Sequence, residues 1–347
     1  MGIPKARHTE RDNHMGATVI LGAQWGDECK GKISAHIAKK NNIKYIYKAG
    51  IGPNAEHGLY FEKDGPYVKC NQLPLGFIRQ PESVIRIGPG VCVDPVKLFA
   101  EIKQFKLEGR VKVDPRCPIV LPEYVQWERD NLKNNSTYSG CGPARSAFVL
   151  RKAKQARDIP ELKDILVDVP EEINRVAENE EVLIECSQGA LLSLALSYDY
   201  PAVTSDNVTT CAALDDVGLR WNLLTDVVMV IKSLPTRESA GSMGDNEYTE
   251  EEMKTLGIHE DSSIDGGKRR KLKSIDFERL EYVAKINGPT QVALTFIDQF
   301  DPISADAKDV YDLSSKVTAL RQKVEHFTHA PVKYLETGKL FNSIIDL

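Results

Sequence analysis

A glycine-rich stretch directly after an apolar run constrains the fold of this chain more than any other feature. The run Thr18–Leu21 is apolar and β-branched, and Gly22–Lys32 then places three glycines among charged residues. A helical pattern begins at Ile33. A strand, a glycine-rich turn and a helix N-terminus form an anion site, because unpaired backbone N–H groups and the helix dipole point into the turn. The pattern predicts an α/β protein that binds phosphate at this turn.

The spacing Gly26-x-x-x-x-Gly31-Lys32 is one residue away from the phosphate-binding motif of nucleotide hydrolases. Ile33 stands where that motif has a Ser or Thr hydroxyl for Mg²⁺. Taken alone, the spacing is also compatible with a glycine turn that only joins a strand to a helix. Asp27 indicates a function, because a carboxylate in a phosphate loop repels the anion unless a metal ion or a proton transfer requires it.

Composition excludes several classes of protein. The 347 residues are 41% hydrophobic, which suits a substantial core. The net charge is -5 and the Lys and Arg residues are dispersed, so we expect no nucleic-acid partner. Seven cysteines without a C-x-x-C pair argue against a disulfide framework or a zinc site and favour the cytoplasm. No apolar run approaches the roughly 20 residues of a membrane helix, so no membrane partner is expected either.

Strand-like runs alternate with helical stretches along the chain, which is typical of an α/β protein with a largely parallel sheet. The expected strands are 18–21, 45–47, 83–87, 119–121, 182–185, 227–231 and 291–296. We expect residues 1–15 to be a disordered leader or expression remnant and residues 16–347 to form a single domain.

Two segments of this domain differ from the rest. Residues from about 150 to 180 have helical spacing, with Pro160 and Pro170 as helix starts, and predict a helical excursion at the surface. Residues from about 238 to 273 are polar and predict a mobile loop. The basic cluster Lys268–Lys271 in this loop is compatible with anion binding and with a solvated run of charge.

Two glycine-rich loops together resemble those of the adenylosuccinate synthetase family. They are Trp25–Lys32 and Gly50–His57, the second ending in Asn-Ala-Glu-His. Further matching motifs follow in the family's order: Ser136–Pro143, Arg151, Glu185–Gly189, Tyr200–Ser205, Lys232–Arg237, the basic cluster and Thr295–Asp298. The resemblance extends from Thr18 to the C-terminus and is closest to the short archaeal form. It implies a P-loop-related α/β fold, with a mainly parallel central sheet flanked by helices and long functional loops.

The resemblance implies a carbon–nitrogen ligase that joins L-aspartate to C6 of a 6-oxopurine nucleoside monophosphate. A nucleoside triphosphate first phosphorylates O6, and the amine of aspartate then displaces that phosphate. By resemblance, Asp27 takes the N1 proton and binds Mg²⁺ together with the backbone carbonyl of Glu56. His57 stabilises the transferred phosphoryl group, Lys30 holds phosphates, and Gln188 lies beside the purine.

The resemblance also assigns residues to three binding sites in a homodimer. The acceptor nucleotide is bound by Asn54, Ser136, Thr137, Gln188 and Thr204, and by Arg151 across the dimer interface. The phosphate donor is bound by Gly26, Glu28, Cys29, Lys30, Gly31, Lys32, Asp298, Thr337 and Gly338. The substrate aspartate is bound by Asp265, Gly266, Lys268 and Arg270. Lys268 marks a changed contact, because lysine cannot hold a carboxylate bidentately as arginine does.

Several residues depart from the family pattern. They are Cys29 and Glu56 for glycines, Asp265-Gly266 for threonines, Lys268 and Lys271 for arginines, and Phe296 for a lysine or apolar residue. With the stretch Val332–Asn342, these departures resemble the phage branch, which makes 2-amino-2'-deoxyadenylosuccinate from dGMP. We therefore expect dGMP as the acceptor, with ATP, dATP or GTP as the donor, in a host cytoplasm if the chain is phage-encoded. Asp27 favours the alternative, IMP with GTP, because many phage members carry serine there.

Two other classes of function stay open at this point. Asp215-x-x-Gly218 and Thr295-x-x-Asp298 imitate motifs of a GTP-binding switch, although Ile33 lacks the hydroxyl that such a switch requires. A diverged protein that binds nucleotides without turnover is the second class.

Overall fold

A nine-stranded sheet forms the centre of the computed structural model, which describes residues 15–132, 137–237, 243–244, 246–256 and 270–347. The strand order is β13-β12-β11-β8-β1-β7-β2-β5-β6. Only the β12–β13 pair of this sheet is antiparallel. The predicted fold class, an α/β protein with a mainly parallel central sheet, is therefore confirmed.

The strands of the central sheet are short and mostly buried. Their bounds are β1 (Gly16–Gly22), β2 (Tyr45–Lys48), β5 (Val84–Ile87), β6 (Val111–Val113), β7 (Glu181–Gly189), β8 (Leu224–Lys232), β11 (Gln291–Thr295), β12 (Val332–Glu336) and β13 (Ile344–Asp346). Two small antiparallel pairs lie outside this sheet: β3 (His57–Tyr60) with β4 (Tyr67–Cys70), and β9 (Thr236–Arg237) with β10 (Arg270–Lys271). Val19, Ile20 and Leu21 in the centre are fully buried, because helices cover both faces of the sheet.

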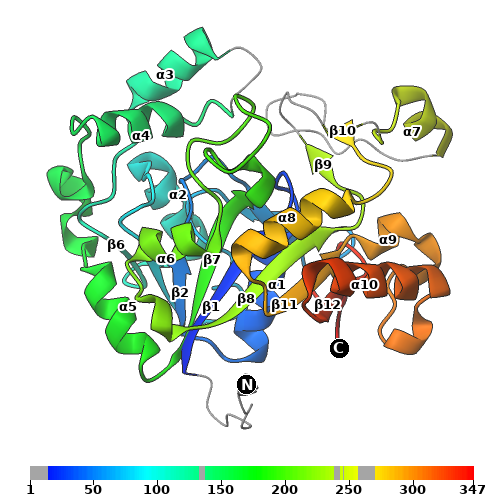
Figure 1. The fold of residues 1–347 in the computed structure, drawn as a ribbon. Coiled ribbons are helices and arrows are strands. Elements are labelled where there is room, and N and C mark those ends of the chain that lie inside the picture. The colour runs from blue at the N-terminus through cyan, green and yellow to red at the C-terminus, as the bar shows by residue number, and fades with distance from the viewer. Residues whose placement is uncertain (1–14, 133–136, 238–242, 245, 257–269) are drawn as a thin grey trace, which may run out of the picture.

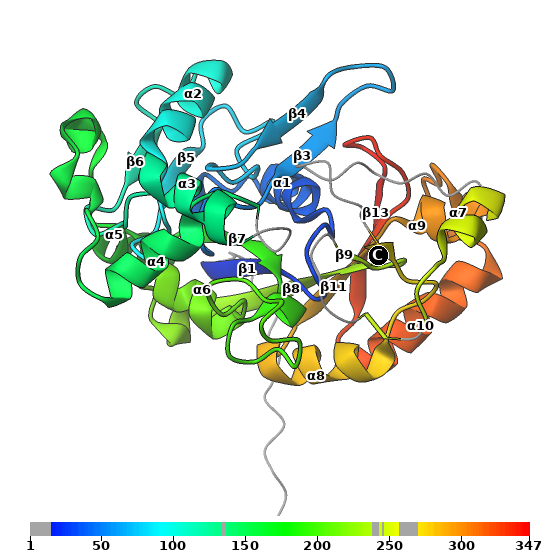
Figure 2. The same ribbon diagram turned by 90° about the horizontal axis from the view of Figure 1, so that it is seen from above.

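Helices form a layer on each side of the sheet (Figures 1 and 2). One layer contains α1 (Lys30–Lys40) and α2 (Pro95–Phe105), which pack on Ile20, Ile46 and Ile85 among others. The other layer contains α5 (Val169–Ala177), α6 (Thr210–Val217), α8 (Phe277–Asn287) and α10 (Ser315–Thr328). The other helices of the described residues are α3 (Pro122–Asn131), α4 (Cys141–Val149), α7 (Glu250–Leu256) and α9 (Ile297–Phe300). The same part of the chain contains six short 3-10 helices: η1 (Ala156–Asp158), η2 (Pro160–Ile165), η3 (Ala190–Leu192), η4 (Trp221–Leu223), η5 (Pro302–Ser304) and η6 (Val310–Asp312). Among the described residues, no helix is long and apolar enough to cross a membrane.

One predicted strand is wrong, and the segment 150–180 contains the helices predicted to start near Pro160 and Pro170 but lies only partly at the surface. Residues 119–121 make only a single bridge, from Ile119 to Val93, because Pro122 begins α3 directly afterwards. The segment 150–180 is not a surface excursion throughout, because Ile173 and Val176 of α5 are buried against the sheet. The predicted leader 1–15 lies outside the described residues except for Met15.

The polar segment 238–273 contains more regular structure than its composition indicates. The described part of it includes helix α7 and strand β10. Residues 238–242, 245 and 257–269 lie outside the described residues, so the predicted mobility of the loop stays a prediction.

Candidate active site

A cavity of about 850 Å³ opens where the central parallel strands end. Its wall includes residues 25–32 after β1, residues 54–60 after β2, and Phe296, Asp298 and Gln299 after β11. The carboxyl ends of parallel strands meet at one edge of a sheet, where α/β proteins bind their ligands. The two glycine-rich loops singled out in the sequence therefore line one cavity.

The carboxylate of Glu28 occupies the interior of the first loop. Its Oε1 accepts hydrogen bonds from the backbone N–H groups of Gln24 and Gly26 at 3.0 and 2.9 Å, and its Oε2 accepts one from Lys30 Nζ at 2.7 Å. Glu28 is fully buried. A Cβ at Gly22 would lie 2.3 Å from Glu28 Oε2, so this glycine makes room for the carboxylate. Lys30 lines the cavity, but its charge is paired inside the loop.

Asp27 stands at the cavity side of the same loop, in a left-handed backbone conformation with φ of 61°. Its Oδ2 accepts hydrogen bonds from Lys232 Nζ at 2.6 Å and from the Thr236 hydroxyl at 2.8 Å. Neither Lys232 nor Thr236 was among the predicted site residues. Both lie in a motif that matches the family, and this motif was the only sequence signal for them, because they are more than 200 positions from Asp27.

The second loop brings His57 beside Glu185, which lies in the middle of β7. His57 Nδ1 is hydrogen-bonded to Glu185 Oε1, and the same carboxylate accepts from the backbone N–H groups of Leu75 and Gly76. Both side chains are buried. Because an ionised carboxylate can only accept, the Nδ1 atom carries the proton of this hydrogen bond. His57 Nε2 has no partner among the described residues, and His57 lines the cavity, so this atom is available to a ligand.

Burial and charge set the protonation of this pair. Burial, together with the positive charge of Lys48, lowers the pKa of His57 to about 4. Burial alone would raise the pKa of Glu185, but His57 and Lys48 outweigh it and lower this pKa to about 2. Glu185 is therefore an anion and His57 is neutral at pH 7 without a ligand. An anionic phosphoryl group beside Nε2 would favour the imidazolium form.

Several predicted donor-site residues gather around Lys32. Lys32 Nζ donates to Glu336 Oε1 at 2.7 Å and to the carbonyl of Gly338 at 2.5 Å. The Thr337 hydroxyl is fully buried and donates to the carbonyl of Ala307 at 3.0 Å. Lys32 lines the cavity. The Thr337 side chain does not line it and instead bonds to the backbone at Ala307.

Asp298 also lines the cavity, and its Oδ1 is buried without a hydrogen-bond partner among the described residues. Burial, assisted by the negative charge of Glu336, raises the pKa of Asp298 to about 6. Cys29 lines the cavity as well, and burial raises the pKa of its thiol to about 12. Cys29 is therefore a neutral thiol, whereas Asp298 offers an unpaired acceptor.

The predicted acceptor-site residues are only partly brought together. Asn54, Thr137 and Gln188 line the cavity, and Asn54 Oδ1 and Gln188 Oε1 are buried without partners among the described residues. Thr204 and Arg151 do not line it. Arg151 is exposed just beyond the end of α4, and Ser136 lies outside the described residues.

The predicted aspartate site falls mostly in the part of the chain that is not described. Asp265, Gly266 and Lys268 lie outside the described residues. Arg270 begins β10 and forms an ion pair with Glu247 at 3.4 Å. Its neighbour Lys271, one of the departures from the family pattern, donates to Gln299 Oε1 at 2.7 Å.

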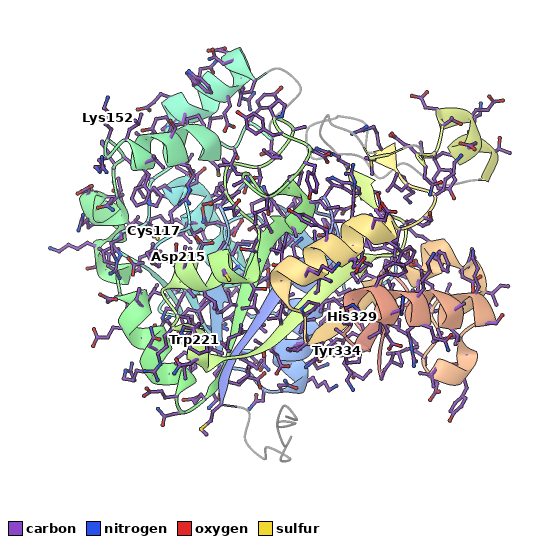
Figure 3. All side chains as sticks on the ribbon, viewed as in Figure 1. Cys117, Lys152, Asp215, Trp221, His329 and Tyr334 are labelled. Carbon is purple, nitrogen blue, oxygen red and sulfur yellow. The ribbon has the colours of Figure 1, made fainter. Side chains whose placement is uncertain are left out.

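The motif that imitates a GTP-binding switch has a structural explanation instead. Asp215 belongs to α6, in a helical layer on a face of the sheet and not in the wall of the cavity (Figure 3). Gly218 ends this helix in the left-handed conformation with φ of 67°, where a Cβ would lie 2.7 Å from that of Pro170. The Asp-x-x-Gly spacing is therefore explained by the last turn of α6 and the glycine that ends this helix.

The fold and the site define a nucleotide-dependent enzyme whose phosphate-binding loop carries a carboxylate of its own. Residues 19–163 and 155–337 match the sequence profile described as adenylosuccinate synthetase, and the chain belongs to this family. It is thus a carbon–nitrogen ligase of the adenylosuccinate synthetase type. The family binds a nucleoside monophosphate, aspartate and a nucleoside triphosphate, and generally uses Mg²⁺.

Relatives of known name match almost the whole chain. The adenylosuccinate synthetase of Archaeoglobus fulgidus is 40% identical over 338 residues, covering 96% of this chain and 98% of the relative. That of Methanocaldococcus jannaschii is 39% identical over 338 residues, covering 95% and 96%.

Two solved structures share the fold. The fully ligated adenylosuccinate synthetase of Plasmodium falciparum has a TM-score of 0.86 at 20% identity and covers 96% of this chain and 100% of that one. The succinoaminodeoxyadenylate synthetase of cyanophage S-2L, bound to dGMP and dATP, has a TM-score of 0.82 at 23% identity, with 96% and 95% covered. At these identities the likeness concerns the fold.

Proposed function

We propose that this ligase joins L-aspartate to C6 of IMP, with GTP as the phosphoryl donor. The observation that carries the proposal is that Asp27, His57 and Gln188 line one cavity, with His57 held from behind by Glu185. The choice of IMP rests on the archaeal relatives, which are named adenylosuccinate synthetase and match nearly the whole chain. These relatives favour IMP over dGMP, which the sequence motifs alone placed first.

In the proposed reaction, Asp27 accepts the proton from N1 of the purine, and the electrons of the N1–H bond make O6 an oxyanion. O6 then attacks the γ-phosphorus of GTP, the bond from this phosphorus to the β-phosphate oxygen breaks, and GDP leaves. His57 Nε2 donates to the transferred phosphoryl group, with Glu185 holding the ring from Nδ1. The amine of aspartate finally attacks C6 and inorganic phosphate leaves, which forms the new C–N bond.

Asp27 and Glu56 in the wall of the cavity fit a magnesium ion. Mg²⁺ prefers oxygen ligands and is commonly held by one or two carboxylates together with substrate phosphates. The carboxylate of Asp27 and the backbone carbonyl of Glu56 supply such oxygens, and both residues line the cavity. When bound, the ion would neutralise charge on the donor phosphates.

Asp298 supports a guanine nucleotide as the donor. Guanine presents N–H donors at N1 and N2, and an ionised carboxylate accepts both, whereas adenine has neither donor in this arrangement. The unpartnered Oδ1 of Asp298 offers the acceptor that such a base requires.

The pKa of Asp298 predicts how GTP use depends on pH. The carboxylate must be ionised to accept both N–H groups, and it becomes protonated as the pH falls through about 6. The KM for GTP should therefore rise about tenfold per pH unit below that value and stay flat above it. Steady-state kinetics between pH 5.5 and 8 test this expectation. In Asp298→Asn the KM should be high at every pH, and an unchanged pH profile in this variant would contradict the assignment.

Arg151 is proposed to act across a homodimer interface, since it is exposed and does not line the cavity of its own chain. Arg151→Ala and Asp27→Asn should each be nearly inactive alone. After the two variants are unfolded and refolded together in equal amounts, one site in each mixed dimer is intact, so about a quarter of the wild-type activity should return. No recovery in a mixture shown to contain mixed dimers would place Arg151 outside the partner's site.

One assay decides the acceptor and the donor together. IMP, GMP, dGMP and dIMP are each supplied with aspartate, Mg²⁺ and either GTP, ATP or dATP, and the succinyl-purine product is quantified by mass spectrometry. We expect the highest kcat/KM for IMP with GTP. A preference for dGMP would instead assign the chain to the synthesis of 2-amino-2'-deoxyadenylosuccinate, and no product with any pair would indicate a nucleotide-binding protein without turnover.

A further inference from the structure

Lys232 has no part in the chemistry described so far, yet its ammonium group contacts the carboxylate at the centre of that chemistry. Its Nζ lies 2.6 Å from Asp27 Oδ2 and 3.0 Å from the hydroxyl of Thr236. The side chain of Lys232 is fully buried, whereas that of Asp27 is 30% exposed. Burying an ammonium group costs solvation free energy, so its presence here requires a compensating interaction.

The backbone of Lys232 is fixed to the loop that carries Asp27. Lys232 is the last residue of β8 and pairs with Thr295 of β11. The side-chain amide of Gln24 accepts from the N–H group of Lys232 at 2.9 Å and donates to its carbonyl at 3.1 Å. The glycine-rich loop therefore contacts both the backbone and the ammonium group of Lys232, which leaves the pair of charged groups little freedom to separate.

The ring of Phe296 covers the ammonium group of Lys232. Nζ lies 4.1 Å from the ring centroid, within the range of a cation–π interaction. Phe296 is held in a left-handed conformation with φ of 57°, because its N–H group donates to Glu336 and its carbonyl accepts from Ser233. Phe296 lines the cavity two residues before Asp298. Lys232 Nζ thus contacts both the Phe296 ring and the carboxylate of Asp27.

We propose that Lys232 is a positioning residue for the ligase reaction. Together with the Thr236 hydroxyl, it holds the Asp27 carboxylate in the orientation that receives the N1 proton of the acceptor. The proposal rests on the function proposed above. Two donors on the same oxygen restrict rotation of the carboxylate, and a misplacement of about 1 Å at a reacting group can cost roughly 100-fold in rate.

The test begins with Lys232→Met, which keeps an unbranched side chain of similar length and removes the charge. We expect kcat to fall roughly 100-fold, while the KM for each nucleotide changes less than about threefold, because substrate contacts remain. Lys232→Arg should recover part of kcat, since a guanidinium can donate to both oxygens. Lys285→Met is the matched control, because Lys285 is 64% exposed on α8, and it should retain wild-type kinetics.

A double-mutant cycle separates positioning from a merely structural role. In the Asp27→Asn background, Lys232→Met should cause almost no further loss, because Lys232 acts through the carboxylate that is already removed. An additive loss, or a folded Lys232→Met variant with wild-type kcat, would overturn the proposal. The proposed function is tested separately, by the turnover of the wild-type protein in the assay with IMP, GMP, dGMP and dIMP, so its failure can be told apart from a failure of the Lys232 proposal.

Thr236→Val provides a second route if Lys232→Met does not fold. It removes only the hydroxyl that donates to Asp27 at 2.8 Å. We expect kcat to fall roughly 10-fold, as for the loss of one hydrogen bond to a charged group, with a thermal unfolding midpoint close to that of the wild type. An unchanged kcat in Thr236→Val would contradict the proposal that Lys232 and Thr236 together orient the Asp27 carboxylate.

Discussion

Replacing Asp27 with asparagine should lower kcat by roughly three orders of magnitude, because an amide cannot accept the N1 proton. The amide has nearly the same shape as the carboxylate, and its oxygen can still accept from Lys232 Nζ and the Thr236 hydroxyl. The variant should therefore fold normally and bind the acceptor nucleotide. Single-turnover formation of the 6-phosphoryl intermediate measures the affected step directly.

Isothermal titration with the acceptor nucleotide is the control for Asp27→Asn, since it shows whether binding survives the substitution. A variant that binds the acceptor but keeps more than a tenth of wild-type kcat would assign the proton transfer to another group.

Replacing Glu185 with alanine should have the largest effect on stability of any change in the site. Glu185 is fully buried, and its carboxylate accepts from Leu75 and Gly76 N–H groups as well as from His57. Its removal leaves these donors without an acceptor in the interior, so we expect the free energy of unfolding to fall by about 3–5 kcal/mol. Urea denaturation at pH 7 measures this difference, and kcat should fall as well because His57 loses its support.

The pKa of Glu185 also predicts the pH dependence of this difference. The pKa is about 2 in the folded chain and 4.5 ordinarily, so the carboxylate contributes its full stabilisation above the higher value. The part of this contribution that depends on ionisation should disappear as the pH falls through about 2, so the difference in stability between the two proteins should narrow. Glu278→Ala, at an exposed position of α8, is the control and should match the wild type throughout. Equal stabilities of Glu185→Ala and wild type at pH 7 would show that the buried donors find other acceptors.

The sequence could predict the parts of the site that are formed by one continuous segment of the chain. The loop Gly22–Lys32 and the loop ending at His57 have glycines at the positions where the backbone turns, and both were predicted as parts of one site. Strands such as β1 and β8 were predicted from their apolar runs. Short strands at the edges of the sheet, such as β6 and β13, were missed because three residues carry too little periodicity.

The parts that the sequence could not predict depend on contacts between distant segments. The contact of Lys232 with Asp27 spans 205 positions, and the contact of His57 with Glu185 spans 128. In the sequence, Lys232 and Glu185 could be recognised only as members of motifs that match the family, and no role was predicted for either. Glu28 was predicted to bind the donor, but a sequence pattern cannot show that a carboxylate folds back onto the N–H groups of its own loop.

The position of Glu28 has a consequence for how this loop relates to nucleotide hydrolases. The loop carries its own anion, so its interior is filled and shaped before any substrate arrives, and a phosphate group must bind outside that interior. Ile33, where hydrolases have a hydroxyl, is fully buried in the core against Ile20 and Leu183. Restoring a serine there would place a hydroxyl in an apolar layer and would not create a hydrolase. In this chain the loop encloses a carboxylate of its own and presents the side chain of Asp27 to the cavity.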